Sequence, residues 1–381
     1  MKYKIIDKKY RFITAFDTKT GAYVRSGVID KNGKDTGIDP FMASFPHLID
    51  VGIMGHCVHG KTGLCVKAGI GCYQSGLTIE KPNMKLKDFI WIAEQCSGRC
   101  NQFALGGRGD PDQHENFEDI LKICKENNIV PNFTTSGYGM TPEIAKLCKE
   151  YCGAVAVSWY RSEYTYNAIN MLLKAGVKTN IHYVLGNNSI DEAIERLYNN
   201  DFPKGINAVI FLLHKPIGMG LKENMLKISN PKVKKFFELL DLKYPFKIGM
   251  DSCNVPGAIN FCKNIVPEAF DTCEGGRYSC YIGADMIMLP CSFDQNQIYK
   301  VNLRDKNIEE AWNSKEFEKF RENMLRACPD CNNSELCKGG CPLMPDIVLC
   351  DKKERKIFKG GTLIWSLELI SWQIQVVVHF Y

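Results

Sequence analysis

The sequence predicts an α/β fold in which a partial (βα)6-type parallel barrel is followed by a small cysteine-rich domain. Between residues 46 and 250, apolar strand-like runs alternate with helix-like segments, which is typical of a parallel sheet covered by helices. From residue 251 to 351 the pattern changes to short strands and turns, and ten of the 18 cysteines lie there. We therefore expect two structural units of different character.

The barrel is predicted from seven apolar runs separated by six helical segments. The strands are 48–54, 101–105, 129–134, 153–159, 177–185, 206–213 and 246–250, and the helices lie near 85–96, 115–127, 141–152, 163–175, 189–200 and 231–242. Thr141 before Pro142 is a helix-start signal, and Ser189 followed by Glu192 fits a capping box. Active sites of such barrels lie at the C-terminal ends of the strands.

The remaining segments flank this barrel. Residues 1–45 resemble short strands joined by turns, and one helix is expected at 308–325 in the cysteine-rich domain, 251–351. Residues 352–381 form an apolar tail that either docks on the protein or is non-native. Polar residues interrupt its apolar stretch, 361–381, so no membrane span is expected.

Composition excludes some function classes. The net charge of +5 is mild and the basic residues are dispersed, so no nucleic acid partner is expected. The N-terminus has no apolar segment of a secretory signal, which predicts a cytoplasmic protein. Stable disulfides are rare in the cytoplasm, and clustered cysteines there more often bind metal or take part in chemistry.

Three cysteines follow the first barrel strand. Cys57, Cys65 and Cys72 lie on one glycine-rich loop, where three thiolates can hold three irons of a cubane cluster and leave the fourth iron open. A zinc site that includes His56 or His59 is the alternative.

The second strand ends in another glycine-rich turn. Adjacent glycines at a strand end permit close approach to a ligand, and an aspartate could accept hydrogen bonds from an ammonium group. The candidate residues are Gly106, Gly107, Arg108, Gly109 and Asp110. Later strand ends add Ser136, Ser158 and His182, although each could instead cap a helix or lie satisfied in the core.

Together, the cysteine loop and the turn GGRGDP resemble the radical S-adenosylmethionine (SAM) superfamily. The resemblance covers roughly residues 46–250 and implies that the three cysteines bind a [4Fe–4S] cluster and that the turn binds the amino group of SAM. The loop differs from the family pattern, because its spacings are seven and six residues instead of three and two.

The C-terminal cysteines have a more specific spacing. Eight thiolates match two fully ligated [4Fe–4S] clusters, and two zinc sites are the alternative. The pattern Cys328-x2-Cys331-x5-Cys337-x3-Cys341, followed by Cys350, resembles the SPASM domain of peptide-modifying radical SAM enzymes. The resemblance assigns Cys273, Cys280, Cys291 and Cys341 to a first auxiliary cluster and Cys328, Cys331, Cys337 and Cys350 to a second. If Cys280 is not a ligand, the first cluster has an open iron.

The resemblance implies a radical SAM enzyme with three [4Fe–4S] clusters and bound SAM. Such an enzyme uses an external one-electron reductant, cleaves SAM, and takes hydrogen from a peptide or protein substrate. The expected product is a thioether or carbon–carbon cross-link in a ribosomal peptide.

One alternative is an anaerobic sulfatase-maturating type of enzyme, in which an aspartate follows the cysteine at the position of Cys291. In this chain Ser292 follows that cysteine, and the nearest acid is Asp294. A non-enzymatic electron carrier or zinc module is the other alternative.

Overall fold

The computed structural model describes all residues except 1, 265, 267–269, 327, 329–330 and 352–381. The predicted apolar tail, 352–381, lies outside the described residues. Within the described residues, no helix is long and apolar enough to cross a membrane.

A large sheet forms the centre of the molecule. Its parallel strands follow one another in chain order, and each pairs with the next: β4 (Leu48–Met54), β5 (Gln102–Gly107), β6 (Val130–Thr135), β7 (Val155–Ser158), β8 (Thr179–Leu185), β9 (Ala208–Leu213) and β10 (Lys247–Met250). The seven predicted strands are thus confirmed, with ends shifted by two residues or fewer. Near-continuous apolar runs predict them well because these strands are buried on both faces.

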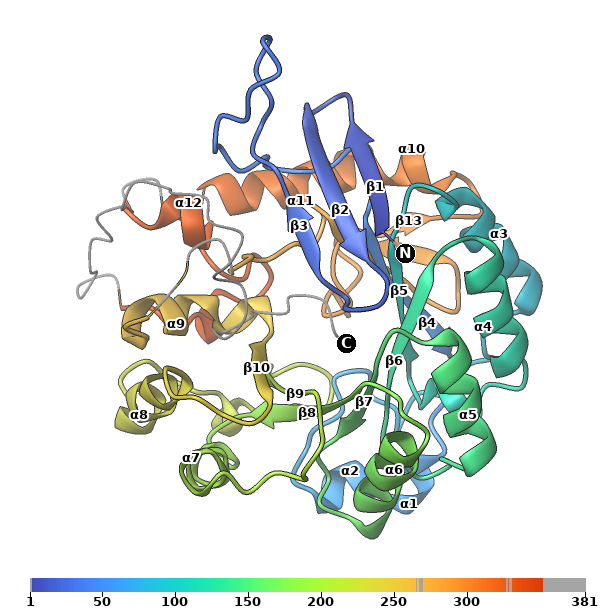
Figure 1. Ribbon diagram of the computed structural model, residues 1–381, viewed down its shortest axis with the longest axis vertical. Coiled ribbons are helices and arrows are strands. Elements are labelled where there is room, and N and C mark those ends of the chain that lie inside the picture. The colour runs from blue at the N-terminus through green and yellow to red at the C-terminus, as the bar shows by residue number, and fades with distance from the viewer. Residues whose placement is uncertain (1, 265, 267–269, 327, 329–330, 352–381) are drawn as a thin grey trace.

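Helices cover the outside of this curved sheet (Figure 1). They are α3 (Leu86–Cys96), α4 (Phe117–Glu126), α5 (Pro142–Tyr151), α6 (Glu163–Lys174), α7 (Ile190–Asn199) and α8 (Pro231–Leu240). Short helices occupy loops: α1 (His59–Thr62), α2 (Leu64–Lys67), η1 (Pro111–Gln113) and η2 (Lys222–Asn224). The partial barrel predicted from the sequence is therefore confirmed.

One of the two predicted helix starts is correct. The Thr141 hydroxyl accepts a hydrogen bond from the Ile144 amide, so it caps α5. The capping box at Ser189 is wrong. Its hydroxyl donates to the Val184 carbonyl and accepts from the Gly186 amide, while Glu192 binds Arg161 and Arg196.

The cysteine-rich region extends the same sheet. Strand β11 (Ser279–Ile282) pairs in parallel with β4, and β12 (Ile287–Leu289) and β13 (Val301–Asn302) follow antiparallel. The sheet therefore runs across the predicted domain boundary at residue 251, which stays a prediction. The other elements of this region are η3 (Ser252–Asn254), α9 (Val255–Phe261), α10 (Ile308–Trp312), α11 (Lys315–Arg326), α12 (Ser334–Cys337) and η5 (Pro345–Ile347).

The single helix predicted at 308–325 is two helices. Helix α10 ends at Trp312, and α11 starts at Lys315. The Ser314 hydroxyl accepts a hydrogen bond from the Phe317 amide, as an N-cap does. The apolar periodicity continues across the break, so the sequence pattern does not reveal it.

The N-terminal segment forms a separate antiparallel sheet of β1 (Lys2–Asp7), β2 (Phe12–Asp17) and β3 (Tyr23–Arg25). Short strands were expected here. Two bonds tie the residues after this sheet to the cysteine-rich region: the Trp312 indole donates to the Ala43 carbonyl at 2.9 Å, and the Ala43 amide donates to the Arg277 carbonyl. The segment that follows the N-terminal sheet is thus packed against the cysteine-rich region.

Candidate active site and auxiliary cysteine clusters

The three loop cysteines lie at the carboxyl end of β4. A Cβ atom added to Gly76 would lie 3.0 Å from the Cys57 Cβ and 3.6 Å from the Cys72 Sγ, so both cysteines border the same small space. The Gly76 amide donates to the Cys72 Sγ at 3.4 Å. Burial, followed by the nearby charge of Cys72, raises the pKa of Cys65. The loop thus brings the three predicted ligands into one neighbourhood.

The turn GGRGDP lies directly against this loop. A Cβ atom on Gly109 would lie 2.5 Å from the His56 carbonyl oxygen and 3.3 Å from the Cys57 Cα. A Cβ atom on Gly76 would lie 3.0 Å from the Arg108 carbonyl oxygen. The two glycine-rich segments that the sequence singled out are therefore packed backbone to backbone.

The two adjacent glycines of this turn have different surroundings. A Cβ atom on Gly107, which has a φ of +116°, would lie 2.3 Å from the Met54 carbonyl oxygen of β4. A Cβ atom on Gly106 would meet nothing within 4 Å. Close packing of β5 on β4 thus explains glycine at position 107, whereas Gly106 borders open space. Their assignment to a cofactor stays a prediction.

A buried polar triangle joins the turn to the cysteine loop. Asp110 Oδ2 accepts a hydrogen bond from the Ser136 hydroxyl at 2.6 Å and lies 2.7 Å from His59 Nε2. Ser136 Oγ also lies 2.7 Å from His59 Nε2. The structure brings two predicted cofactor residues, Asp110 and Ser136, together with His59, which the sequence suggested only as a zinc ligand.

Next to this triangle lies a second buried aspartate. Asp112 is 5% exposed, and burial, followed by the charge of Asp110, raises its pKa to about 7. Sequence reasoning missed it, because nothing in the pattern distinguishes the two aspartates of this segment. It gives this part of the site a group that titrates near neutral pH.

Ser158 and His182 lie on neighbouring strands. They are register partners of β7 and β8, and His182 Nδ1 lies 3.0 Å from the Thr134 hydroxyl. Tyr160 follows β7 and lies between these residues and the cysteine loop. Burial raises the pKa of its hydroxyl, and the nearby charges of Cys65 and Asp110 raise it further. The predicted polar residues and this unpredicted tyrosine therefore belong to one region at the carboxyl ends of the strands.

The structure brings together the four cysteines that the resemblance assigns to the second auxiliary cluster. Burial, followed by the charges of Cys350, Cys328 and Cys331, raises the pKa of the Cys337 thiol to about 11. The chain reverses after Cys337 through Lys338, Gly339 and Gly340, all of which have positive φ. Glycine adopts this conformation without a steric penalty. All four predicted ligands of this cluster are thus neighbours.

The first auxiliary set is brought together only in part. One cavity is lined by Cys273, Cys291 and Cys341, and Cys253 joins them. A hydrogen bond with Cys341, followed by burial, raises the pKa of the Cys253 thiol. Cys280 borders the cavity, but the cysteine charge that acts most strongly on its thiol is that of Cys100. Sequence reasoning missed Cys253 because it lies outside the signature.

Within the part of the chain that the structure describes, no three His, Cys, Asp or Glu side chains are close enough to hold one metal ion. Thiolates around one zinc each lie about 2.3 Å from the same metal, whereas those of a [4Fe–4S] cluster bind different irons and lie farther apart.

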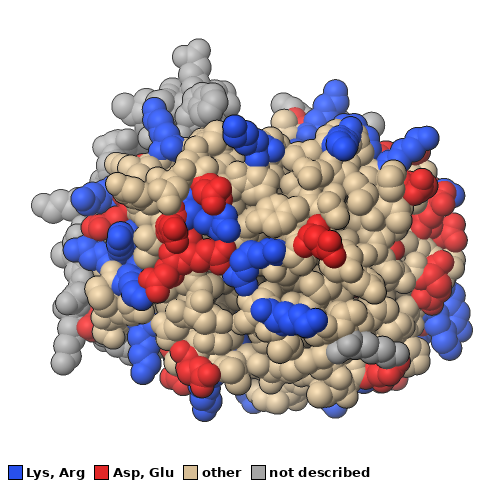
Figure 2. Space-filling view, turned by 90° about the horizontal axis from the view of Figure 1, so that it is seen from below, with Lys and Arg blue, Asp and Glu red and all other residues tan. Residues whose placement is uncertain are grey.

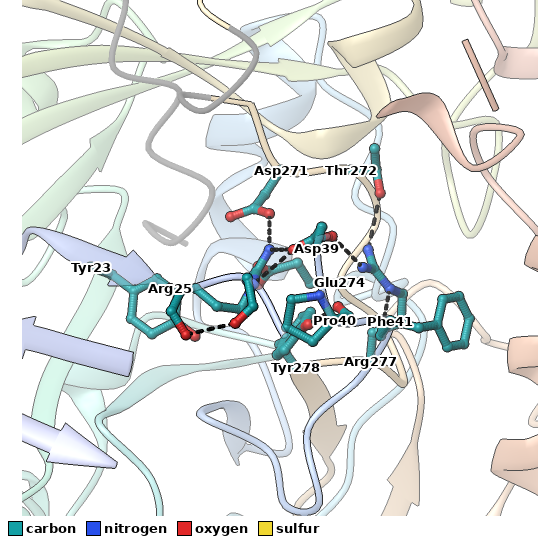
Figure 3. Close-up of polar contacts among 12 residues, drawn as sticks. Tyr23, Arg25, Asp39, Pro40, Phe41, Asp271, Thr272, Glu274, Arg277 and Tyr278 are labelled. Atoms are coloured by element: carbon teal, nitrogen blue, oxygen red, sulfur yellow. Dashed lines mark hydrogen bonds and ion pairs between the residues drawn. The ribbon is translucent and has the colours of Figure 1, made fainter. Parts of the chain in front are cut away.

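The N-terminal sheet holds the loop that carries Cys273 (Figure 3). Arg25 Nη2 lies 2.6 Å from Asp271 Oδ1 and 2.8 Å from Asp39 Oδ1, and its guanidinium lies 4.1 Å from the centre of the Tyr278 ring. Arg277 donates to the carbonyl oxygen of Cys273 at 3.4 Å. Residues far apart in sequence therefore fix the position of this cysteine.

The face in Figure 2 carries charged side chains of both signs. Lys and Arg side chains are interspersed there with Asp and Glu, and neutral residues cover most of the area.

The barrel, the cysteine loop after its first strand and the cysteine-rich extension of its sheet define the fold of the radical SAM enzymes with a SPASM domain. Residues 273–339 match the SPASM family, an iron–sulfur cluster-binding domain. The resemblance predicted from the sequence is confirmed, and with it an iron–sulfur domain at the C-terminal end.

Solved structures agree with this fold. SuiB of Streptococcus suis bound to S-adenosylmethionine is 15% identical over 79% of this chain and 74% of its own, with a TM-score of 0.58. SuiB bound to its precursor peptide SuiA is 16% identical over 79% and 72%, with a TM-score of 0.56. Native anSMEcpe with bound AdoMet and Cp18Cys peptide is 17% identical over 78% and 89%, also with a TM-score of 0.56. No curated protein sequence matches the chain.

Proposed function

We propose that this chain is a radical SAM enzyme that modifies a peptide, installing a thioether or carbon–carbon cross-link in a ribosomal peptide. The observation that carries the proposal is the packing of the cysteine loop against the turn GGRGDP at the carboxyl ends of β4 and β5. Active sites of parallel barrels lie at this edge. The peptide ligands of SuiB and anSMEcpe support a peptide substrate.

In this proposal, Cys57, Cys65 and Cys72 hold the catalytic [4Fe–4S] cluster. When bound, SAM supplies a 5′-deoxyadenosyl radical after one-electron reduction by an external donor. The open space beside Gly106 leaves room for its amino-acid end, and the triangle of His59, Asp110 and Ser136 lies within the same buried region. Ser158 and His182 border it from the next strands.

The auxiliary cysteines have a different task. A cross-link removes two hydrogen atoms from the peptide: one is taken by the radical, and the other leaves as a proton and an electron. We assign acceptance of that electron to the clusters of the SPASM domain. A reducing compartment keeps cysteine thiols from forming disulfides and so leaves them available as cluster ligands, and we therefore place the enzyme in the cytoplasm.

The sulfatase-maturating alternative finds less support. Its base would have to be Asp294, the nearest acid after Cys291. Asp294 is buried, and its carboxylate accepts hydrogen bonds from the amides of Ile298 and Tyr299 at 3.0 and 2.9 Å. A carboxylate that caps a turn in this way is poorly placed to take a proton from a substrate.

The test is an anaerobic assay of the reconstituted enzyme with SAM and dithionite. We expect formation of 5′-deoxyadenosine, and with a peptide encoded beside the gene we expect a product that has lost two hydrogen atoms, as measured by mass spectrometry. An iron-loaded enzyme that forms no 5′-deoxyadenosine in the presence of such peptides would refute the proposal.

A further inference from the structure

We propose that Cys253, and not Cys280, is the fourth cysteine ligand of the first auxiliary cluster, together with Cys273, Cys291 and Cys341. The inference rests on the auxiliary clusters proposed above, but it does not depend on SAM cleavage or on the peptide. It replaces a ligand that signature spacing suggests with one that only the fold reveals.

Cys253 reaches the cavity from the end of β10. It lies on the short turn η3 and lines the same cavity as Cys341. Across the cavity, a Cβ atom on Gly275 would lie 3.6 Å from both the Cys273 Sγ and the Cys291 Cβ, so these two cysteines face the same space. Cys253 acts electrostatically on both of them. Five cysteines line this cavity, and these contacts and charges connect Cys253, Cys273, Cys291 and Cys341 to one another.

Cys280 faces the other side of the sheet. It lies within β11, where successive side chains point to opposite faces. Tyr281 points to the inner face, because its hydroxyl lies 2.4 Å from a Cβ atom built on Gly52 of β4. Cys280 therefore points outward, beside its register partner Ile49, which is fully buried in the apolar core.

The neighbours of Cys280 confirm this direction. It lies near Cys96 and Cys100, which belong to the same apolar core and border helix α3. Cys280 is 2% exposed and packs as a small apolar residue would. Turning its thiol into the cavity would require β11 to shift by one residue against β4, which would reverse every side chain of the strand.

The turn that carries Cys253 is held rigidly. Asp251 Oδ2 accepts hydrogen bonds from Lys215 Nζ at 2.6 Å and from the Leu213 amide at 3.2 Å. Asn254 Nδ2 donates to Asp251 Oδ1 at 2.8 Å and to the Phe211 carbonyl at 3.0 Å. Such a turn presents its cysteine in a fixed position, which a cluster ligand requires.

Lys215 also provides charge at the right place. Its ammonium is buried and lies on the same cavity as Cys253 and Cys341. A cluster bound by four thiolates carries a net negative charge, and a nearby cation stabilises such a group in a buried site. No lysine or arginine is among the residues that line this cavity apart from Lys215.

The experiment compares two matched substitutions, Cys253→Ser and Cys280→Ser, in the full-length reconstituted protein. Serine is close to cysteine in size, but an oxygen ligand changes the electronic properties of the iron that it binds. We expect Cys253→Ser to shift the midpoint potential and the Mössbauer spectrum of one auxiliary cluster. Cys280→Ser should leave all clusters unchanged.

Iron release provides a second measurement that does not require normal activity. We expect a chelator to extract iron from Cys253→Ala several-fold faster than from the wild type, with Cys280→Ala releasing iron at the wild-type rate. Altered spectra in Cys280→Ser, or wild-type spectra in Cys253→Ser, would overturn the proposal. If the wild type held no auxiliary clusters, both this ligand assignment and the proposed role of those clusters would be overturned. If the clusters were intact but SAM were not cleaved, only the proposed function would be overturned.

Discussion

The ring of Tyr73 packs against the ring of Phe293, with centroids 4.4 Å apart and planes inclined by 36°. Tyr73 directly follows Cys72 of the barrel loop, and Phe293 lies two residues after Cys291 of the auxiliary cavity. Lys215 Nζ lies 4.4 Å from the centre of the Phe293 ring. One aromatic contact therefore connects the candidate SAM site to the first auxiliary site.

The first prediction concerns this contact. Phe293→Leu keeps an apolar side chain but removes the ring pair, which is worth about 0.5–1.5 kcal/mol beyond the area it buries. We expect a modest loss of stability and a lower ratio of modified peptide to 5′-deoxyadenosine, because the two sites are no longer held together. Phe261→Leu, which removes a looser contact with Phe237 at 6.3 Å, is the control. An unchanged product ratio would mean that the contact is only structural.

The second prediction concerns the barrel cluster. Replacing Cys57, Cys65 and Cys72 by alanine should reduce bound iron from about 12 to about 8 atoms per chain, at four irons per cluster. Formation of 5′-deoxyadenosine should cease, while the spectra of the auxiliary clusters persist. If the triple variant still cleaved SAM, the catalytic cluster would have to lie elsewhere.

The fold could be predicted from the sequence because its strands are long apolar runs buried on both faces. The grouping of the second auxiliary set could also be predicted, because three of its four cysteines are close in sequence and only Cys350 lies farther along the chain. The sequence does not reveal contacts that depend on which way a side chain points. Spacing cannot show that Cys280 faces the core, and it cannot bring Cys253 from the end of β10 to Cys341.

Local sequence rules also omit tertiary contacts. Ser189 has the sequence of a capping box, but its hydroxyl is used by the preceding loop and Glu192 is used by two arginines. Gly107 fits a ligand-binding turn, yet the nearest atoms belong to Met54 of the neighbouring strand. In each case the structure adds a tertiary contact that a single sequence does not contain.

The third prediction separates the two adjacent glycines of the turn. Gly107→Ala should destabilise the protein strongly, because the new Cβ would lie 2.3 Å from the Met54 carbonyl oxygen and φ is +116°. Gly106→Ala has open space and should leave the melting temperature close to that of the wild type. We expect Gly106→Ala instead to weaken SAM binding in calorimetry. Unchanged affinity would show that the space beside Gly106 is not used by SAM.

The fourth prediction concerns the buried ion pair beside the auxiliary cavity. Although burial lowers it, the pKa of Lys215 is raised overall because of the Asp251 charge. Lys215→Met would leave Asp251 buried without its cation, and breaking such a pair typically costs about 3–5 kcal/mol. Anaerobic urea denaturation should show this loss. The double variant Lys215→Met/Asp251→Asn should recover part of it, and failure to recover any would point to lost packing instead.

The last prediction is a pH dependence that originates at Asp112. Its pKa is about 7 in the folded protein, compared with 3.8 for an ordinary aspartate, because burial and the charge of Asp110 disfavour the carboxylate. Below neutral pH the folded protein therefore holds a proton that the unfolded chain has released, so stability falls as pH rises from about 4 to about 7 and then levels off. A difference of about three pKa units corresponds to about 4 kcal/mol.

We expect Asp112→Asn to be more stable than the wild type at pH 8.5 and to lose less stability between pH 6 and 7 in anaerobic urea denaturation. Asp119→Asn, at an exposed position on α4, should keep the wild-type pH profile. Identical profiles for Asp112→Asn and the wild type would show that Asp112 stays ionised throughout this range.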